Sequence, residues 1–253
     1  MSRRPGFPAR LEPFAGAPKP RGNLPAAAPA AAPGGIGLDS QAVRLRMVQK
    51  LAGQGIADVQ VLAAMSLVQR HRFVDSALVN QAYEDTSLPI GLGQTISKPN
   101  VVARMIELLL GGRREASGKL GRVLEIGTGC GYQAAVLSRV AGEVYSIERL
   151  RSLHEKAREN LRTFRLANVH LLFGDGMAGY AKGAPYAGII AAAGGDAVPA
   201  AWLDQLAVGG RIVAPTSMPG GMQALVVIER TMTELKQTVL ETVHFVPLKS
   251  GIA

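Results

Sequence analysis

A glycine-rich stretch, Glu125-Ile-Gly127-Thr-Gly129-Cys-Gly131, holds the residues best suited to bind a small molecule. Glycines keep the backbone thin, so a ligand can approach the main chain without meeting a Cβ atom. An apolar run before the stretch predicts a strand, and the helix predicted after it would direct free N–H groups at the ligand. Dinucleotide sites use the spacing Gly-x-Gly-x-x-Gly, but Tyr132 stands where that motif needs its last glycine. The loop therefore disfavours an NAD-dependent oxidoreductase.

Two acidic residues follow the next two predicted strands. Glu148 ends the second strand, 21 residues beyond Gly127, where a carboxylate can accept hydrogen bonds from ribose hydroxyls. The alternative is that Glu148 stabilises the N-terminus of the helix after it. Asp175 and Gly176 follow the third strand, and an Asp-Gly pair is also the composition of a plain turn. We predict that all three residues belong to the site of the glycine loop.

The elements that must position these residues alternate along the second half of the chain. The predicted strands are residues 122–126, 143–147, 169–173, 188–192 and 211–214. The predicted helices between them are residues 132–140, 150–166 and 199–206, the last ended by two glycines. Such alternation predicts an α/β fold with a doubly wound, mostly parallel, Rossmann-like sheet. Two further strands without a helix between them, residues 223–229 and 235–245, predict an antiparallel edge.

An N-terminal helical extension precedes this core. Apolar residues at helical spacing predict two helices after Ser40, the second with Asp58 as its N-cap. Residues 73–99 are turn-rich, and Ser97 stands just before a third helix, where it suits an N-cap. We expect one domain over residues 39–253, divided into helices and a further segment at 39–118 and a ligand-binding core at 119–253. Residues 1–38 hold eight of the fifteen prolines and are predicted to be a disordered tail.

Composition excludes several classes of protein. The single cysteine, Cys130, leaves no intramolecular disulfide, and without a histidine near it in the sequence we interpret it as structural. The four histidines show no metal-ligand spacing, so we expect no metal. No apolar run reaches the roughly 18–20 residues of a membrane span, and no secretory signal is evident. We expect a cytoplasmic protein without a membrane partner.

The glycine loop resembles the first motif of class I S-adenosyl-L-methionine-dependent methyltransferases. Their cofactor has no pyrophosphate, so a shorter loop packed against its amino-acid and sugar portions suffices. The resemblance implies S-adenosyl-L-methionine as the cofactor, with an acid at position 175 that reaches the adenine amino group. The cofactor-binding residues expected in the core are Glu125, Gly127, Gly129, Gly131, Glu148, Asp175 and Gly176.

A more specific resemblance covers residues 41–250. The segments 73–77, 82–85, 88–99, 123–133, 174–176 and 245–248 resemble the protein-L-isoaspartate O-methyltransferase family, and the stretch Gln94-Thr-Ile-Ser97 is highly specific for it. The resemblance implies methylation of the α-carboxyl group of L-isoaspartyl residues in damaged peptides and proteins. The ester collapses to a succinimide that reopens partly to aspartate, which is a repair. Ser97 is the implied catalytic residue, and Gln94, Thr95 and Ser97 are the implied pocket residues.

The chain departs from the family pattern in two places. The family usually has Phe-Asp at the start of the fourth strand and Val-Thr-Ala-Ala-Pro at its end, where this chain has Tyr186-Ala187 and residues 191–196, ending in Asp196. The usual Pro-Arg is Gln69-Arg70. The first departure leaves open a catalytically weakened protein that only binds the cofactor. The net charge of +9 would suit an RNA methyltransferase. However, residues 194–196 supply no aromatic ring to stack a flipped base, so we expect no nucleic-acid partner.

Overall fold

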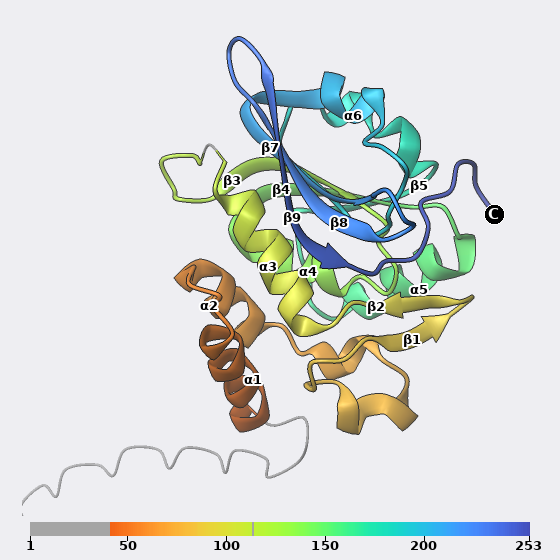
Figure 1. Cartoon of the computed structure of the whole chain (residues 1–253). Coiled ribbons are helices and arrows are strands. Elements are labelled where there is room, and N and C mark those ends of the chain that lie inside the picture. Colours follow the sequence, from red (N-terminus) through yellow and green to blue (C-terminus); the bar gives the residue numbers. More distant parts are fainter. Residues whose placement is uncertain (1–40, 113) are drawn as a thin grey trace, which may run out of the picture. The chain divides into compact units, whose positions relative to one another are not determined.

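A seven-stranded sheet forms the centre of the fold (Figure 1). The strand order is β5–β4–β3–β6–β7–β8–β9, parallel from β5 to β7 and antiparallel from β7 to β9. The predicted doubly wound sheet with an antiparallel edge is thus confirmed. The computed structural model describes residues 41–112 and 114–253, and the predicted tail at 1–38 lies outside the described residues.

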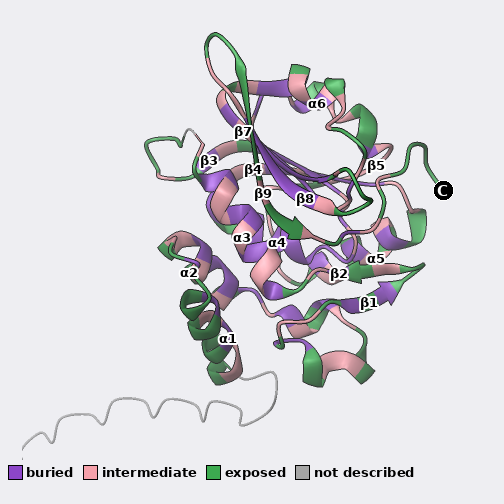
Figure 2. Cartoon of the chain, in the orientation of Figure 1, coloured by how far each residue is buried: buried purple, intermediate pink, exposed green. Residues whose placement is uncertain are grey.

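The strands of this sheet are β3 (Leu120–Ile126), β4 (Ala141–Glu148), β5 (Val169–Phe173), β6 (Tyr186–Ala191), β7 (Leu206–Ser217), β8 (Gln223–Arg230) and β9 (Leu235–Val243). The helices of the core are α4 (Tyr132–Val140), α5 (Arg151–Arg162) and α6 (Ala200–Gln205), with single turns η3 (Gly176–Ala178) and η4 (Ala181–Gly183). Burial is greatest in the inner strands and in α4, whereas β9 at the sheet edge is largely exposed (Figure 2). Parallel strands covered on both faces are expected to be continuously apolar.

One sequence prediction about the core is wrong. The glycine pair 209–210 was expected to end a helix, but α6 stops at Gln205 and β7 runs through both glycines. Tyr186 of β6 already pairs with Leu206, and the register shifts before the next pair. Gly209 has a φ of +81°, a conformation that glycine supplies readily. The glycines therefore form an irregularity inside a strand, which glycine in a strand often marks.

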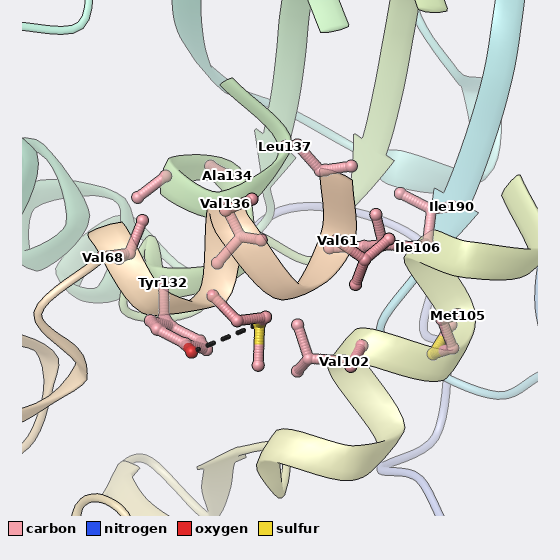
Figure 3. Packing of buried hydrophobic residues seen from close by; sticks show 14 of the residues in the cluster. Val61, Val68, Val102, Met105, Ile106, Tyr132, Ala134, Val136, Leu137 and Ile190 are labelled. Atoms are coloured by element: carbon pink, nitrogen blue, oxygen red, sulfur yellow. Dashed lines mark hydrogen bonds between the residues drawn. The ribbon is translucent and has the colours of Figure 1, made fainter. Parts of the chain in front are cut away.

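The N-terminal helices are α1 (Gln41–Gly53), α2 (Val59–Leu67) and α3 (Pro99–Leu110). They pack against one another, and α2 also packs on α4 while α3 packs on β6 and β7. Asp58 caps α2 as predicted, because its side chain accepts the N–H groups of Gln60 and Val61. Figure 3 shows apolar side chains of α2, α3 and α4 meeting in one cluster, where the Tyr132 hydroxyl donates to the Met65 sulfur at 3.6 Å. Burying each such side chain contributes about 1.5–3 kcal/mol, so these helices and the core form one hydrophobic unit.

The turn-rich segment between α2 and α3 is more regular than the sequence suggested. It holds the 3-10 turns η1 (Arg70–Phe73) and η2 (Ser76–Gln81) and a hairpin of β1 (Leu88–Gly91) and β2 (Gln94–Ile96). Lys156 of α5 anchors the hairpin, because its Nζ donates to Asp75 Oδ1 and to the Ile90 carbonyl, both at 3.1 Å. Among the described helices, none is long and apolar enough to cross a membrane.

Candidate active site

A cavity of about 560 Å³ opens at the carboxyl ends of β3, β4 and β6. β3 lies between β4 and β6, so the chain reverses its direction of winding there, which is where ligands of such sheets bind. The hairpin, the glycine loop, the start of α5, a C-terminal segment and the residues that end or follow β4, β5 and β6 line the cavity. Their residues include Gln94, Thr95, Gly127, Gly129, Glu148, Leu150, Gly176, Ala192, Pro247 and Lys249.

The glycine loop has the left-handed backbone that its composition predicts. Gly127, Gly129 and Gly131 have φ angles of +88°, +56° and +92°, which favour glycine. Gly127 and Gly129 line the cavity directly. Gly131 is the N-cap residue of α4, and a Cβ there would lie 2.9 Å from Leu161 Cδ1. The first two glycines therefore give a ligand access to the backbone, whereas the third lets α4 and α5 approach each other.

Glu148 accepts hydrogen bonds from two backbone groups, one in the glycine loop and one at the start of the next helix. Its Oε2 accepts the N–H of Gly129, and its Oε1 accepts the N–H of Leu150 at the start of α5, each at 2.9 Å. The side chain therefore joins the glycine loop to the next helix while it lines the cavity. Its contact with a ribose stays a prediction.

Glu125 lies behind the loop and is not among the cavity residues. It is fully buried and accepts a hydrogen bond from the Ser146 hydroxyl, which lies 2.6 Å from the Thr128 hydroxyl. Burial raises the pKa of Glu125 to about 8, so the carboxyl group carries its proton at neutral pH. This position favours an action through Thr128 of the loop over direct contact with a cofactor.

Asp175 has its side chain occupied by backbone groups. Oδ1 accepts the N–H of Met177 at 2.8 Å, as in an Asp-Gly turn, and Oδ2 accepts the N–H of Gly251 at 2.7 Å. Only its neighbour Gly176 lines the cavity, and a Cβ on Gly176 would lie 2.5 Å from Ile126 Cγ2. The glycine is thus required by packing. The adenine contact of Asp175 stays a prediction.

A C-terminal strap, residues 246–251, supplies site residues that were not predicted from the sequence. Residues 246–249 line the cavity, although only their resemblance to the family drew attention to residues 245–248. The strap is held by the backbone of Gly194, which donates to the Val246 carbonyl at 2.9 Å and accepts from Leu248 at 2.7 Å. Arg149 adds a bond from Nε to the Gly251 carbonyl at 2.9 Å. The strap thus covers the cavity from the side of β6 and β5.

A second cavity, of about 700 Å³, lies beside the first. Thr95 lines both cavities, and Ser97 lines the second. The C-terminal end of β9 and the residues after it form the opposite wall, including Thr242, His244 and Phe245.

The predicted N-cap role of Ser97 is wrong. Helix α3 begins at Pro99 with Lys98 as its cap residue, and no side-chain cap bond is present. Asp85 takes over part of that task, because its Oδ1 accepts the N–H of Asn100 at 2.9 Å. Proline at the first helical position moves the cap one residue beyond Ser97. The Ser97 hydroxyl is therefore not committed to the helix.

A small third cavity, about 40 Å³, joins the two predicted halves of the site. It is lined by Thr95 and Ser97 on one side and by Gly127 and Gly129 on the other. Cys130 also lines it, but burial raises the pKa of this thiol to about 11, which suits a structural residue. In the part of the chain that is described, no group of three His, Cys, Asp or Glu residues could hold a metal ion.

The fold and the site define a class I methyltransferase: a Rossmann-like sheet with a glycine loop after its first strand and an acid at the tip of the second. Residues 42–253 match the family described as protein-L-isoaspartate(D-aspartate) O-methyltransferase. The chain belongs to this family.

Relatives named protein-L-isoaspartate O-methyltransferase are similar over most of the chain. The one from Methylibium petroleiphilum is 59% identical over 87% of this chain and 81% of its own length. The one from Leptothrix cholodnii is 60% identical over 86% of this chain and 77% of its own. A solved structure of that name has a TM-score of 0.74 at 29% identity and covers 83% of this chain and 67% of its own. A Plasmodium falciparum structure in complex with S-adenosyl-L-homocysteine supports the fold, with a TM-score of 0.67 at 22% identity over 81% and 98% of the two chains.

Only part of the first departure lies at the cavities. Ala192 lines all three cavities and Ala193 lines the first, so the missing threonine would have faced the ligand, whereas Ala187, where the carboxylate is missing, lies at the start of β6 and lines none of the three. In the second departure only Gln69 differs from the usual Pro-Arg, and the retained Arg70 is fully buried. Neither departure removes a residue of the glycine loop.

Proposed function

We propose that this chain transfers a methyl group from S-adenosyl-L-methionine to the α-carboxyl group of L-isoaspartyl residues in peptides and proteins. The observation that carries the proposal is the small cavity shared by Ser97, Thr95 and the glycine loop, because it joins a substrate segment to a cofactor loop. The family supplies the substrate class and the cofactor. The product ester closes to a succinimide, so the reaction begins a repair.

The residues of the first cavity fit the cofactor. The positive φ angles of Gly127 and Gly129 open the main chain to an amino-acid or sugar portion, and Glu148 offers buried carboxylate oxygens to hydroxyl groups. Ile147, Leu150 and Leu153 supply an apolar wall for a flat base. When bound, S-adenosyl-L-methionine supplies an electrophilic methyl group. The chain itself has to bind the cofactor and the substrate, orient them and exclude water from the site.

The substrate needs little activation. A carboxyl group with an ordinary pKa near 4 is already ionised at neutral pH, so no side chain has to remove its proton. Positioning is the remaining task, and we assign it to the Ser97 hydroxyl as the catalytic residue, with Thr95 and Gln94 on the same strand edge. A hydroxyl can donate to one carboxylate oxygen and leave the other free to react. Of the two larger cavities, Gln94 lines only the first, so we assign this residue to cofactor binding.

The partners we propose are proteins and peptides with isoaspartyl residues, in the cytoplasm. The open second cavity, walled by β2 and the end of β9, has the room for an extended peptide. We propose no metal, membrane or nucleic-acid partner. Ageing proteins generate isoaspartyl sites without an enzyme, so a repair enzyme of this kind needs broad peptide acceptance.

One assay tests the proposal. The purified chain is incubated with radiolabelled S-adenosyl-L-methionine and an isoaspartyl peptide or its aspartyl twin. Base-labile label on the isoaspartyl peptide alone would support the proposal. Cofactor binding without label on either peptide would overturn it and favour the catalytically weakened binding protein, which Ala187 and the run Ala191–Ala193 support.

A further inference from the structure

Arg70 is the most deeply buried charged side chain near the site that has no role so far. It begins η1, and its relative exposure is 0%. Nε donates to the Ala82 carbonyl and Nη2 donates to the Ser97 carbonyl, each at 2.8 Å. The planar guanidinium therefore ties the end of η2 to the residue that we propose as catalytic.

The positive charge of Arg70 is not neutralised by a bonded carboxylate. Among the described residues no ion pair includes it, and its Nη1 has no hydrogen-bond acceptor. Burial lowers the pKa of Arg70, but a guanidinium keeps its proton in proteins. Asp85 attracts it only through space, since that carboxylate is bonded to Asn100 and Gln54.

The aromatic neighbour of Arg70 also stays neutral. The guanidinium carbon lies 4.7 Å from the ring centroid of Tyr132, and burial raises the pKa of that hydroxyl to about 12. Tyr132 is the first residue of α4, directly after the glycine loop, and it lines the same small cavity as Ser97. Arg70 thus contacts the substrate segment by hydrogen bonds and the cofactor loop by its cation–π contact (Figure 3 shows Tyr132 in its packing).

We propose that Arg70 is a positioning residue for the substrate carboxylate. By holding the Ser97 carbonyl it fixes the Ser97 hydroxyl beside the glycine loop. Its buried charge, screened little by water, also favours an anion on the hydroxyl side of Ser97. This inference rests on the proposed function, because it assumes an anionic substrate at Ser97.

The experiment compares three variants with the wild type. Arg70→Met removes the charge and the donors to the Ala82 and Ser97 carbonyls with little loss of side-chain volume. Arg70→Lys keeps the charge but cannot bridge two carbonyls with a planar fork. Arg72→Met is the matched control, since Arg72 is exposed on the same turn and contacts Phe164 and Gln69. For each protein, kcat and KM for an isoaspartyl peptide, the affinity for S-adenosyl-L-homocysteine and the melting temperature are measured.

We expect Arg70→Met to lower kcat/KM about 30-fold, with part of the loss in KM, because a charge-assisted hydrogen bond is lost. Affinity for S-adenosyl-L-homocysteine should stay within about threefold, Arg70→Lys should recover part of the activity, and Arg72→Met should match the wild type. If Arg70→Met does not melt cooperatively, the kinetics and the cofactor affinity of Arg70→Lys are compared with those of the wild type instead.

Two results would overturn the inference while leaving the proposed function intact. One is an unchanged kcat/KM in a folded Arg70 variant of an active enzyme. The other is an equal fall of kcat/KM and cofactor affinity, which would mean a general structural role. A wild type that methylates no isoaspartyl peptide would instead overturn the proposed function, and the role of Arg70 with it.

Discussion

The cofactor half and the substrate half of the site are built by different means. The cofactor half consists of the glycine loop and Glu148, which are adjacent strand ends of one sheet. Its geometry is set by backbone φ angles and by bonds from a buried carboxylate to N–H groups. The substrate half combines Thr95 and Ser97 with the end of β9, which lies far from them in the sequence, and its residues are more exposed.

This contrast indicates which property a substitution in each half should change. A change in the cofactor half should alter binding of S-adenosyl-L-methionine, because the backbone itself forms that wall. A change in the substrate half should alter turnover and leave cofactor affinity nearly untouched. Variants that change only cofactor affinity or only turnover would support this division of the site, and variants that change both would contradict it.

The largest effect is expected at Gly127. Valine at a φ of +88° strains the backbone and places methyl groups in the cofactor cavity, so cofactor affinity should fall about 100-fold, or about 3 kcal/mol. Gly220→Val is the matched control, because Gly220 has a φ of +89° with nothing within 4 Å of its Cβ position. Isothermal titration with S-adenosyl-L-homocysteine measures both. Equal losses in the two variants would show that strain alone, and not access to the loop, is responsible.

The next effect is expected at Ser97 and concerns turnover. Ser97→Ala should lower kcat/KM about 30-fold through the lost hydroxyl donor, roughly 2 kcal/mol, while cofactor affinity changes less than about twofold. Ser87→Ala serves as control, since Ser87 lines the second cavity but not the small cavity shared with the glycine loop. Steady-state kinetics with an isoaspartyl peptide measure the difference. Full turnover in Ser97→Ala would remove the catalytic assignment and leave the family membership standing.

A smaller loss of cofactor affinity is expected for Glu148→Gln. The amide keeps one oxygen but turns an NH₂ group toward one of the two backbone N–H donors, so cofactor affinity should fall about tenfold. Glu159→Gln, on the exposed face of α5, should change nothing. If Glu148→Gln lowered turnover at saturating cofactor as strongly as binding, the two halves would not be separable at this residue.

The smallest effect concerns stability and pH. The raised pKa of Glu125, about 8, means that the folded protein holds a proton that the unfolded chain releases above its usual pKa of 4.5. This contribution to stability is fully present below pH 4.5 and is lost as pH rises through about 8. Glu125→Gln cannot lose a proton, so its melting temperature should gain on the wild type at pH 8 relative to pH 5. Glu84→Gln is the control, because Glu84 is exposed, and its melting temperature should show no such trend. If Glu125→Gln also showed no such trend, Glu125 would be ionised in the folded protein and the prediction would be wrong.

The sequence predicted the backbone of the glycine loop and the cap of α2 because this information is local. The positive φ angles of Gly127 and Gly129 and the cap at Asp58 follow from residue types within a few positions of each other. The sequence did not predict contacts between residues that lie far apart in the chain. The second oxygen of Asp175 accepts the N–H of Gly251, 76 residues away in the strap, a contact that no local pattern predicts. The assignment of Ser97 as an N-cap failed because Pro99 set the helix start and Asp85 took part of the capping task.

The most direct test of the central claim follows one peptide through the repair. An isoaspartyl peptide is incubated with the chain and S-adenosyl-L-methionine, and the products are separated and identified by mass spectrometry over time. The account predicts a transient methyl ester, then a succinimide, then a growing fraction of the normal aspartyl peptide, with the aspartyl twin unchanged. Methylation of both peptides alike, or no ester from an enzyme that binds the cofactor, would contradict it.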